Sequence, residues 1–190
     1  MALRVIVVGI PGVGKTTVVQ GVLAGLRSAK LVTFGTLMFE AARSLGWVKD
    51  RDEMRKMPVE KQKRLQKMAA TRIAKMKGKA ILVDTHLFIR TPEGFWPGLP
   101  FEVVRAMKPT HLVLVVAAPE EIAMRRSADP SRARDLVTVE GLREEIEIAK
   151  NFLTVCSTLT GAPMLIVRNE QGKAEEVSKS IVRMLEQATE

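Results

Sequence analysis

The sequence predicts an α/β fold, a doubly wound five-stranded parallel sheet with helices on both faces. Five short runs rich in Val, Ile and Leu are continuous rather than alternating, which is typical of strands buried on both faces. Segments with helical apolar spacing separate these runs, and such alternation produces right-handed crossovers and a parallel sheet. The expected strands are residues 3–8, 30–34, 80–84, 111–116 and 163–167.

The helices are expected in the intervals between the strands. One apolar stripe follows the first strand, and further stripes run through residues 59–77, 142–156 and 177–185. Residues at this spacing lie on one face of a helix and pack against the sheet. Cys156 falls on the stripe within 142–156, so we expect it in the core.

Length and composition favour one domain, residues 1–190. The single cysteine excludes a disulfide framework and a Cys-rich zinc site within one chain. No secretory signal or apolar run of membrane length is evident, so we expect a cytoplasmic protein without a membrane partner. The net charge of +9 calls for an anionic partner. Nucleic acid, a membrane surface and a phosphorylated small molecule are all compatible with that charge.

A glycine-rich motif follows the first strand directly and opens the next helix. It reads Gly9-Ile10-Pro11-Gly12-Val13-Gly14-Lys15-Thr16 and is followed by Thr17. Glycine allows a positive φ and lets backbone N–H groups curl around phosphates, and the helix adds its positive dipole end. Lys15 is expected on the β- and γ-phosphates of ATP, Thr16 in the Mg²⁺ shell, and Thr17 on the phosphates. The motif therefore predicts a P-loop NTPase-like fold that binds ATP.

Asp84 ends the third strand in the run Ile81-Leu82-Val83-Asp84. An acidic residue at this place can hold Mg²⁺ directly or through water. The alternative is an aspartate that caps the following turn.

Three more segments follow the ends of strands or lie close to them, where ligands bind in such sheets. Residues 32–39 can supply a base pocket from backbone groups and apolar side chains. Arg51 and Arg55 are four residues apart and share one face of a helix. His86 and Arg90 lie just beyond the third strand, although His86 could equally be bonded to the backbone.

With these motifs the chain resembles the archaeal-type adenylate kinases over nearly its full length. Several of the matching sequence motifs are unusual, which makes the resemblance specific. They are residues 9–17, Phe34-Gly35-Thr36, residues 50–56, Asp84-Thr85-His86, Arg90-Thr91-Pro92, Pro97-Gly98-Leu99-Pro100 and Ser131-Arg132-Ala133-Arg134-Asp135.

The resemblance implies the Mg²⁺-dependent reaction ATP + AMP ⇌ 2 ADP. It also implies an AMP-binding insertion at about residues 34–64, a short lid at about residues 127–137, and a homotrimer. Catalytic roles fall to Lys15, Arg90, Arg132 and Arg134. The AMP site then comprises Phe34, Gly35, Thr36, Arg51, Arg55, His86 and Arg90, and the metal site Thr16 and Asp84.

The chemistry of the phosphoryl acceptor agrees with this resemblance, but it does not by itself decide between a phosphate and a hydroxyl acceptor. A phosphate acceptor is already a nucleophilic anion, so it needs cations that align two repelling phosphate groups rather than a general base. Arginine suits this role because its planar fork binds phosphate through two N–H groups. A kinase with a hydroxyl acceptor would want a base, and Asp84 or His86 could serve as one.

The basic segment 59–79 leaves a second class open, an ATP-using protein that binds nucleic acid. No nucleic-acid-binding motif accompanies these charges, and a solvated helix face explains them more simply. A regulatory GTPase is discounted because no Asn-Lys-x-Asp word occurs. Trp47 and Trp96 could stack on a base or merely cover apolar surface.

Overall fold

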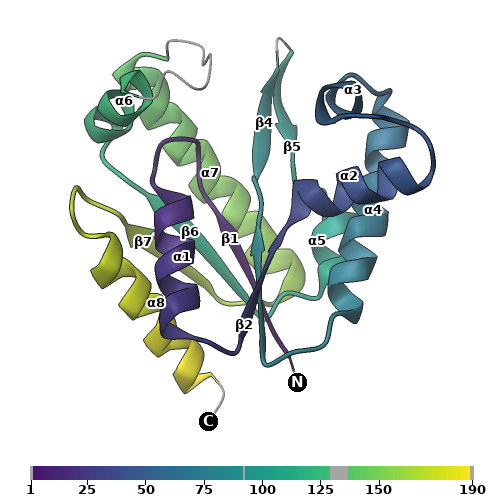
Figure 1. Ribbon diagram of the computed structural model, residues 1–190. Coiled ribbons are helices and arrows are strands. Elements are labelled where there is room, and N and C mark those ends of the chain that lie inside the picture. The colour runs from purple at the N-terminus through teal and green to yellow at the C-terminus, as the bar shows by residue number, and fades with distance from the viewer. Residues whose placement is uncertain (1, 92, 129–136, 189–190) are drawn as a thin grey trace.

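The computed structural model describes residues 2–91, 93–128 and 137–188, and its central layer is the predicted five-stranded parallel sheet (Figure 1). The strand order is β2-β3-β1-β6-β7, so the first strand lies in the middle. The observed bounds differ from the expected ones by at most one residue at either end. The strands are β1 (Leu3–Val8), β2 (Ala29–Thr33), β3 (Ala80–Asp84), β6 (His111–Val116) and β7 (Met164–Arg168).

The register aligns the carboxyl ends of the three strands that precede the predicted binding segments. Val7 of β1 and Thr33 of β2 both pair with Asp84 of β3. The P-loop, the first residues after β2 and the acidic end of β3 therefore leave the sheet at one level. This edge is where ligands bind in open α/β sheets.

Helices cover both faces of the sheet, as the sequence predicts. In Figure 1 α1 and α8 lie side by side in front of the sheet and α7 lies behind it. On that second face α4, α5 and α7 follow one another in contact. The helices are α1 (Lys15–Gly25), α2 (Phe34–Ser44), α3 (Arg51–Arg55), α4 (Val59–Lys75), α5 (Phe101–Met107), α6 (Pro119–Ser127), α7 (Val139–Thr160) and α8 (Ala174–Gln187).

The core consists mainly of Val, Ile and Leu from the strands and the inner helix faces. Within β1 and β3 the apolar residues are buried almost completely, which is why these strands read as continuous apolar runs. Cys156 is buried on α7 as expected, and burial raises the pKa of its thiol.

A two-stranded hairpin is one of the elements that were not expected from the sequence, as are the short helices α5 and α6. It pairs β4 (Phe88–Thr91) with β5 (Gly94–Pro97) in antiparallel fashion. Phe88 anchors it by edge-to-face contact with Phe95 at 5.0 Å between ring centroids, and it also meets Phe152 of α7. In Figure 1 the hairpin stands above the sheet edge, between α6 on one side and α2 and α3 on the other. Pro97 ends β5, so the Pro97-Gly98-Leu99-Pro100 segment begins inside the hairpin.

The chain from α2 to the start of α4 packs around a small core cluster of its own. In this cluster Ala42, Val48 and Leu65 are buried, and Trp47 is packed against them. Lys61 and Arg64 of α4 lie over the Trp47 ring at 5.1 and 5.2 Å. Trp47 therefore covers apolar surface, which was the simpler of its two interpretations.

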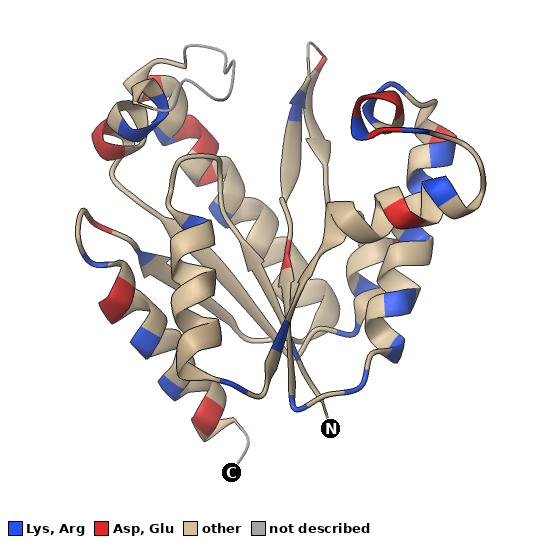
Figure 2. Cartoon of the chain, in the orientation of Figure 1, with Lys and Arg blue, Asp and Glu red and all other residues tan. Residues whose placement is uncertain are grey.

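The basic residues of α4 lie on a solvated helix face. Figure 2 shows the Lys and Arg colour repeated along this helix. Its basic side chains are exposed, while its apolar residues, such as Ala69 and Ile73, face the core. Over the described residues, no helix combines the length and the apolar character that crossing a membrane requires.

Candidate active site at the P-loop

Three glycines give the loop after β1 its path. Gly12 and Gly14 adopt φ values of +93° and +81°, which side chains rarely tolerate. Gly9 passes so close to β6 that a Cβ would lie 2.7 Å from the Val115 carbonyl oxygen. Helix α1 then begins at Lys15, with Gly14 as its N-cap. The loop and the free N–H groups of the first helical turn form the anion-binding geometry expected from the motif.

Lys15 lies within this loop and contacts the carboxylate of Asp84 at the end of β3. Its side chain is only 11% exposed, and burial lowers the pKa of the ammonium to about 8. The Asp84 carboxylate acts in the opposite direction because it favours the charged form of Lys15. The sequence placed Lys15 at the start of the helix after the first strand and Asp84 at the end of the third strand, and the fold brings the two side chains into direct contact.

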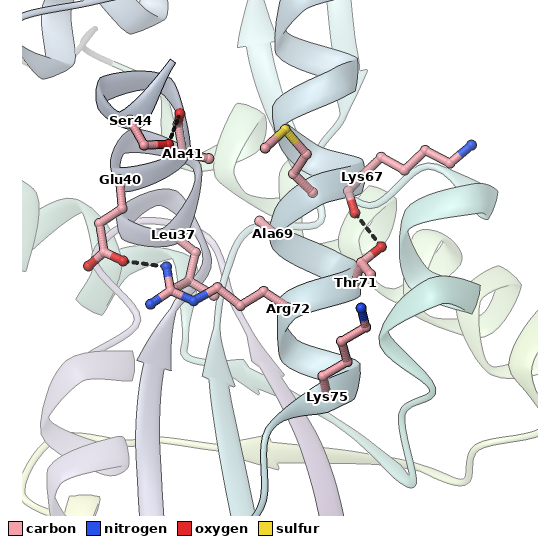
Figure 3. A pocket seen from close by; sticks show the side chains of 10 residues that line it. Leu37, Glu40, Ala41, Ser44, Lys67, Ala69, Thr71, Arg72 and Lys75 are labelled. Carbon is pink, nitrogen blue, oxygen red and sulfur yellow. Dashed lines mark hydrogen bonds and ion pairs between the residues drawn. The ribbon is translucent and has the colours of Figure 1, made fainter. Parts of the chain in front are cut away.

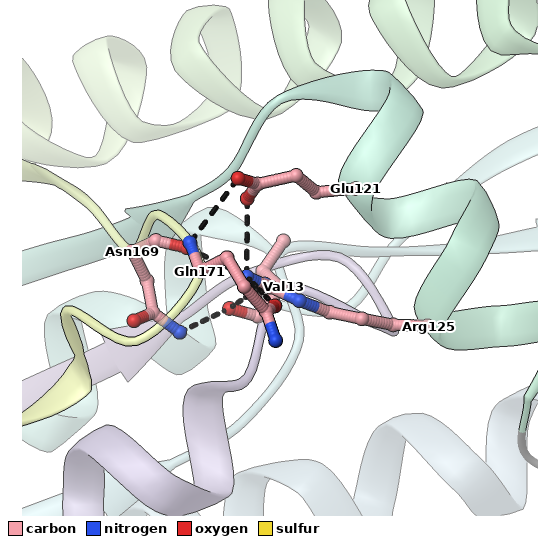
Figure 4. Close-up of polar contacts among 5 residues, drawn as sticks. All are labelled: Val13, Glu121, Arg125, Asn169 and Gln171. Carbon is pink, nitrogen blue, oxygen red and sulfur yellow. Dashed lines mark hydrogen bonds and ion pairs between the residues drawn. The ribbon is translucent and has the colours of Figure 1, made fainter.

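The middle of the loop is fixed from the opposite side of β1 by a polar cluster (Figure 4). The side-chain amide of Asn169 donates to the Val13 carbonyl at 2.8 Å, and its backbone N–H donates to Val116 at 2.7 Å. Arg125 of α6 donates to the carbonyl oxygens of Val13 and Asn169 at 3.3 and 3.1 Å, and to Glu121 at 3.0 Å. The loop is thus held by two elements that follow the last two sheet strands.

A second arginine of α6 reaches the start of the loop. Arg126 donates its Nε–H to the Pro11 carbonyl at 2.9 Å and an Nη2–H to Glu145 of α7 at 3.2 Å. Arg90 of the hairpin donates to the other oxygen of Glu145 at 3.3 Å. The Glu145 side chain is only 6% exposed. One buried carboxylate therefore joins two guanidinium groups from different elements beside the loop.

His86 lies against the P-loop, as the sequence suggested. A narrow crevice is lined by Gly9, Pro11 and His86 together with neighbouring apolar residues. Gly98 packs directly under this segment, since a Cβ there would lie 2.3 Å from the His86 carbonyl oxygen. Its N–H donates to Leu87 at 2.7 Å. The chain that follows β5 therefore supports the segment that carries His86.

The expected acceptor residues lie at the start of α2 and on α3. Phe34 is buried as the first residue of α2, and a Cβ on Gly35 would meet open space. Arg51 donates to the Thr36 hydroxyl at 2.9 Å and lies over the Phe39 ring. These contacts bring Arg51 to the beginning of α2, beyond the carboxyl end of β2.

Arg55 is placed differently from its predicted partner. Its side chain is 73% exposed and forms an ion pair with Asp52 at 2.7 Å, within the same short helix. The structure thus brings Arg51, but not Arg55, into contact with Thr36. Arg132 and Arg134 lie outside the described residues, as does most of the expected lid.

Thr16 and Asp84 are the protein groups suited to Mg²⁺. The Thr16 hydroxyl sits in the first turn of α1, and the Asp84 carboxylate ends the neighbouring strand β3. Among the described residues, no group of three or more His, Cys, Asp or Glu side chains is gathered for a metal. Such a pair still fits the ion, since Mg²⁺ keeps several waters and takes one or two protein oxygens plus substrate phosphates.

A larger hollow of about 760 Å³ lies away from these groups, between α2 and α4 (Figure 3). Leu37, Ala41 and Ala69 line it, and an ion pair between Glu40 and Arg72 at 2.6 Å crosses it. It contains neither the loop nor any of the predicted phosphate ligands. Volume alone therefore does not locate the reaction in this molecule.

Sequence reasoning missed Glu145 and Asn169, although each carries a signal. Glu145 interrupts the buried stripe of α7, next to Ile146 and between Leu142 and Ala149, and a charge on the apolar face of a helix is unusual. Asn169 directly follows the carboxyl end of β7, and a polar residue just after a strand lies at the edge of the sheet where ligands bind.

Comparison with known proteins identifies the family of the chain. The family described as "AAA domain" matches residues 8–143. An adenylate kinase of Thermoplasma acidophilum is 41% identical and one of Methanoculleus marisnigri 44% identical, each over 96% of this chain and at least 97% of the relative. A shikimate kinase of Acinetobacter baumannii, solved in complex with shikimate, shares the fold at a TM-score of 0.62 and 15% identity, over 99% of this chain and 95% of its own. With this identity to the curated relatives over nearly its whole length, the chain belongs to the adenylate kinase family.

Proposed function

We propose that this protein is an Mg²⁺-dependent adenylate kinase that transfers the γ-phosphoryl group of ATP to AMP and forms two ADP. The observation that carries this proposal is the set of cations around the P-loop. Lys15 lies in the loop, Arg126 is bonded to it, and Arg90 shares the buried carboxylate of Glu145 with Arg126. Such a set suits a reaction between two phosphate groups, which repel each other until cations neutralise them.

On the donor side, the loop N–H groups and the start of α1 bind the β- and γ-phosphates, and Lys15 neutralises their charge. Thr16 and Asp84 would hold Mg²⁺, which supplies further charge neutralisation on the phosphate oxygens. The hydrogen bond from Asn169 to Val13 keeps the loop backbone in its anion-binding path. This preorganisation lowers the cost of aligning the donor.

On the acceptor side, Arg51 and the start of α2 are suited to the AMP phosphate, with His86 and Arg90 nearer the loop. An oxygen of the AMP phosphate forms a new bond to the γ-phosphorus of ATP. The bond from that phosphorus to the β–γ bridging oxygen breaks, and this oxygen leaves as part of ADP. No side chain has to remove a proton, because the attacking oxygen is already ionised at neutral pH. Arg132 and Arg134 of the expected lid would add positive charge over the transferring group.

A hydroxyl-acceptor kinase is the competing function, since Asp84 or His86 could act as a base there. The Asp84 contact with Lys15 disfavours this use of Asp84, because the carboxylate is already paired with the ammonium group. The test is a coupled assay with ATP and, in turn, AMP, CMP, UMP, GMP and shikimate. We expect AMP to be used far faster than the other four acceptors. The Lys15→Ala variant should be nearly inactive, so any turnover in its preparation measures contaminating enzymes. Turnover of shikimate with none of AMP would overturn the proposal.

The proposal extends to location and assembly. We infer a cytoplasmic homotrimer that binds no nucleic acid stably. Large apolar side chains exposed on α7 and on the edge strand β7 support self-association, namely Val155, Leu159, Met164 and Ile166. Light scattering after size-exclusion chromatography measures the mass directly, and a monomer at micromolar concentration would contradict this part.

A further inference from the structure

We propose that Glu145 of α7 is a positioning residue that holds Arg90 and Arg126 where the transferring phosphoryl group is bound. This inference rests on the proposed function, but it concerns a residue that reaches the P-loop only through Arg126 and the expected AMP site only through Arg90. It assigns to one buried acid the alignment of two arginines that come from separate elements.

The geometry around Glu145 leaves both arginines able to bind phosphate. One carboxylate oxygen accepts from Arg90 at 3.3 Å and the other from Arg126 at 3.2 Å. Each guanidinium group has five N–H donors and gives only one of them to Glu145. The remaining donors of each fork can bind an anion while the carboxylate fixes the direction of the side chain.

The two arginines connect Glu145 to opposite sides of the site. Arg126 also donates to the Pro11 carbonyl, so its position is tied to the donor loop. Arg90 extends from β4 and lies over the ring of Phe95 at 5.5 Å, so its position is tied to the hairpin. A shift of the hairpin relative to the loop would therefore break a bond to Glu145.

Stability alone does not account for an acid at this position. The neighbouring residues of the same α7 face, Leu142, Ile146 and Ala149, are buried and apolar. Replacing a buried ion-pair network with apolar residues is often neutral or stabilising, because the charges must be removed from water. A carboxylate that both arginines require is better explained by their placement than by the free energy of folding.

The test compares Glu145→Gln, Glu145→Asp and the matched control Glu144→Gln. Glutamine removes the charge at nearly constant volume. Aspartate keeps the charge, which favours folding, but is shorter by ~1.5 Å and cannot reach both arginines. Glu144 is exposed on the same helix, so Glu144→Gln removes an equal charge without touching either arginine.

We expect Glu145→Gln to lower kcat about 10- to 100-fold in both reaction directions, and Glu145→Asp to lower it by about 10-fold. The dissociation constants of ATP alone and of AMP alone, measured by calorimetry, should change by less than about threefold, since most binding contacts remain. Glu144→Gln should match the wild-type protein. Wild-type kcat in a folded Glu145→Asp variant would overturn the proposal.

A spectroscopic readout separates this inference from the proposed reaction. In ¹⁵N-arginine-labelled protein, the Nη2–H resonance of Arg126, which is the donor to Glu145, should be slow to exchange with water, and Glu145→Asp should accelerate that exchange about 10-fold or more. Unchanged exchange would refute the positioning role whatever reaction the enzyme catalyses. Changed exchange in a protein that makes no ADP from AMP would support the positioning role and overturn only the proposed function.

Discussion

Replacement of Gly14 by alanine tests two requirements of the P-loop. The loop needs a residue that tolerates a positive φ at position 14, and it needs the hydrogen bond from Asn169. Gly14 has φ +81°, and a Cβ there would lie 2.4 Å from the Asn169 amide nitrogen. Gly161 at the end of α7 has a similar φ of +70°, but a Cβ there meets nothing within 4 Å. Gly161→Ala is therefore the matched control, because it introduces the backbone strain without the collision.

The expected magnitudes follow from these two environments. A left-handed alanine costs about 1–2 kcal/mol, which both variants share. At Gly14 the Asn169 amide must also move, which breaks its 2.8 Å bond to Val13. Leaving such buried groups unsatisfied costs about 1–3 kcal/mol more. The total of about 2–5 kcal/mol corresponds to a factor of roughly 30 to several thousand in an equilibrium constant.

Two measurements distinguish the variants, namely urea unfolding and kcat/KM for ATP in the coupled assay. Gly161→Ala should lose about 1–2 kcal/mol of stability and keep kcat/KM within about twofold. In Gly14→Ala the loop relieves the collision by moving, so kcat/KM for ATP should fall about 100-fold. The reasoning would be refuted if Gly14→Ala kept kcat/KM within about threefold of the control and unfolded at the same urea concentration.

Three further predictions concern the charged groups. Lys15→Met should lower kcat about 1,000-fold with little change in the unfolding midpoint, and a loss below about 10-fold would contradict its role on the phosphates. Because burial lowers the pKa of Lys15 to about 8, its charge is complete well below that pH and disappears above it. We therefore expect kcat/KM for ATP to fall as pH rises through about 8, whereas kcat at saturating ATP stays constant because bound phosphates restore the proton. A kcat/KM that is flat between about pH 7 and 9.5 would exclude this titration. Arg51→Ala should raise KM for AMP about 10-fold or more, and by more than Arg55→Ala does, since only Arg51 contacts Thr36. KM for ATP is the internal control, and equal effects of the two variants on AMP would refute the distinction.

The three inner strands were predictable because burial on both faces leaves a direct trace in the sequence. The edge strands β2 and β7 are largely exposed, so their apolar runs reflect strand formation rather than the burial on both faces that we expected. Continuous apolar runs marked all five parallel strands, and the glycine motif marked the end of β1. The hairpin left no comparable trace. Its strands have four residues each, and Phe88 is anchored partly by Phe152, 64 positions away on α7. A tertiary contact of this kind has no local pattern.

Site residues that belong to one sequence motif could be predicted. Contacts between residues from separate segments were harder to predict. Lys15 and Asp84 each end a strand or open a helix, so their positions could be inferred from order along the chain. The bonds that join Arg90 and Arg126 to Glu145 span 55 and 19 residues. Arg55 shows the converse, because helical spacing put it beside Arg51 but could not reveal its ion pair with Asp52.

Two acids, the buried Glu145 and the partly exposed Asp84, also explain how a protein of net charge +9 can gather cations at one point. Two guanidinium groups side by side repel each other, and weak screening makes this repulsion large inside a protein. Glu145 offsets it for Arg90 and Arg126, and Asp84 does the same for Lys15. A phosphate group then meets cations that the fold has already aligned, so little reorganisation remains for the reaction itself. Removal of either acid leaves the number of cations unchanged but should disturb their alignment. The Glu145 variants should therefore change kcat more than nucleotide affinity.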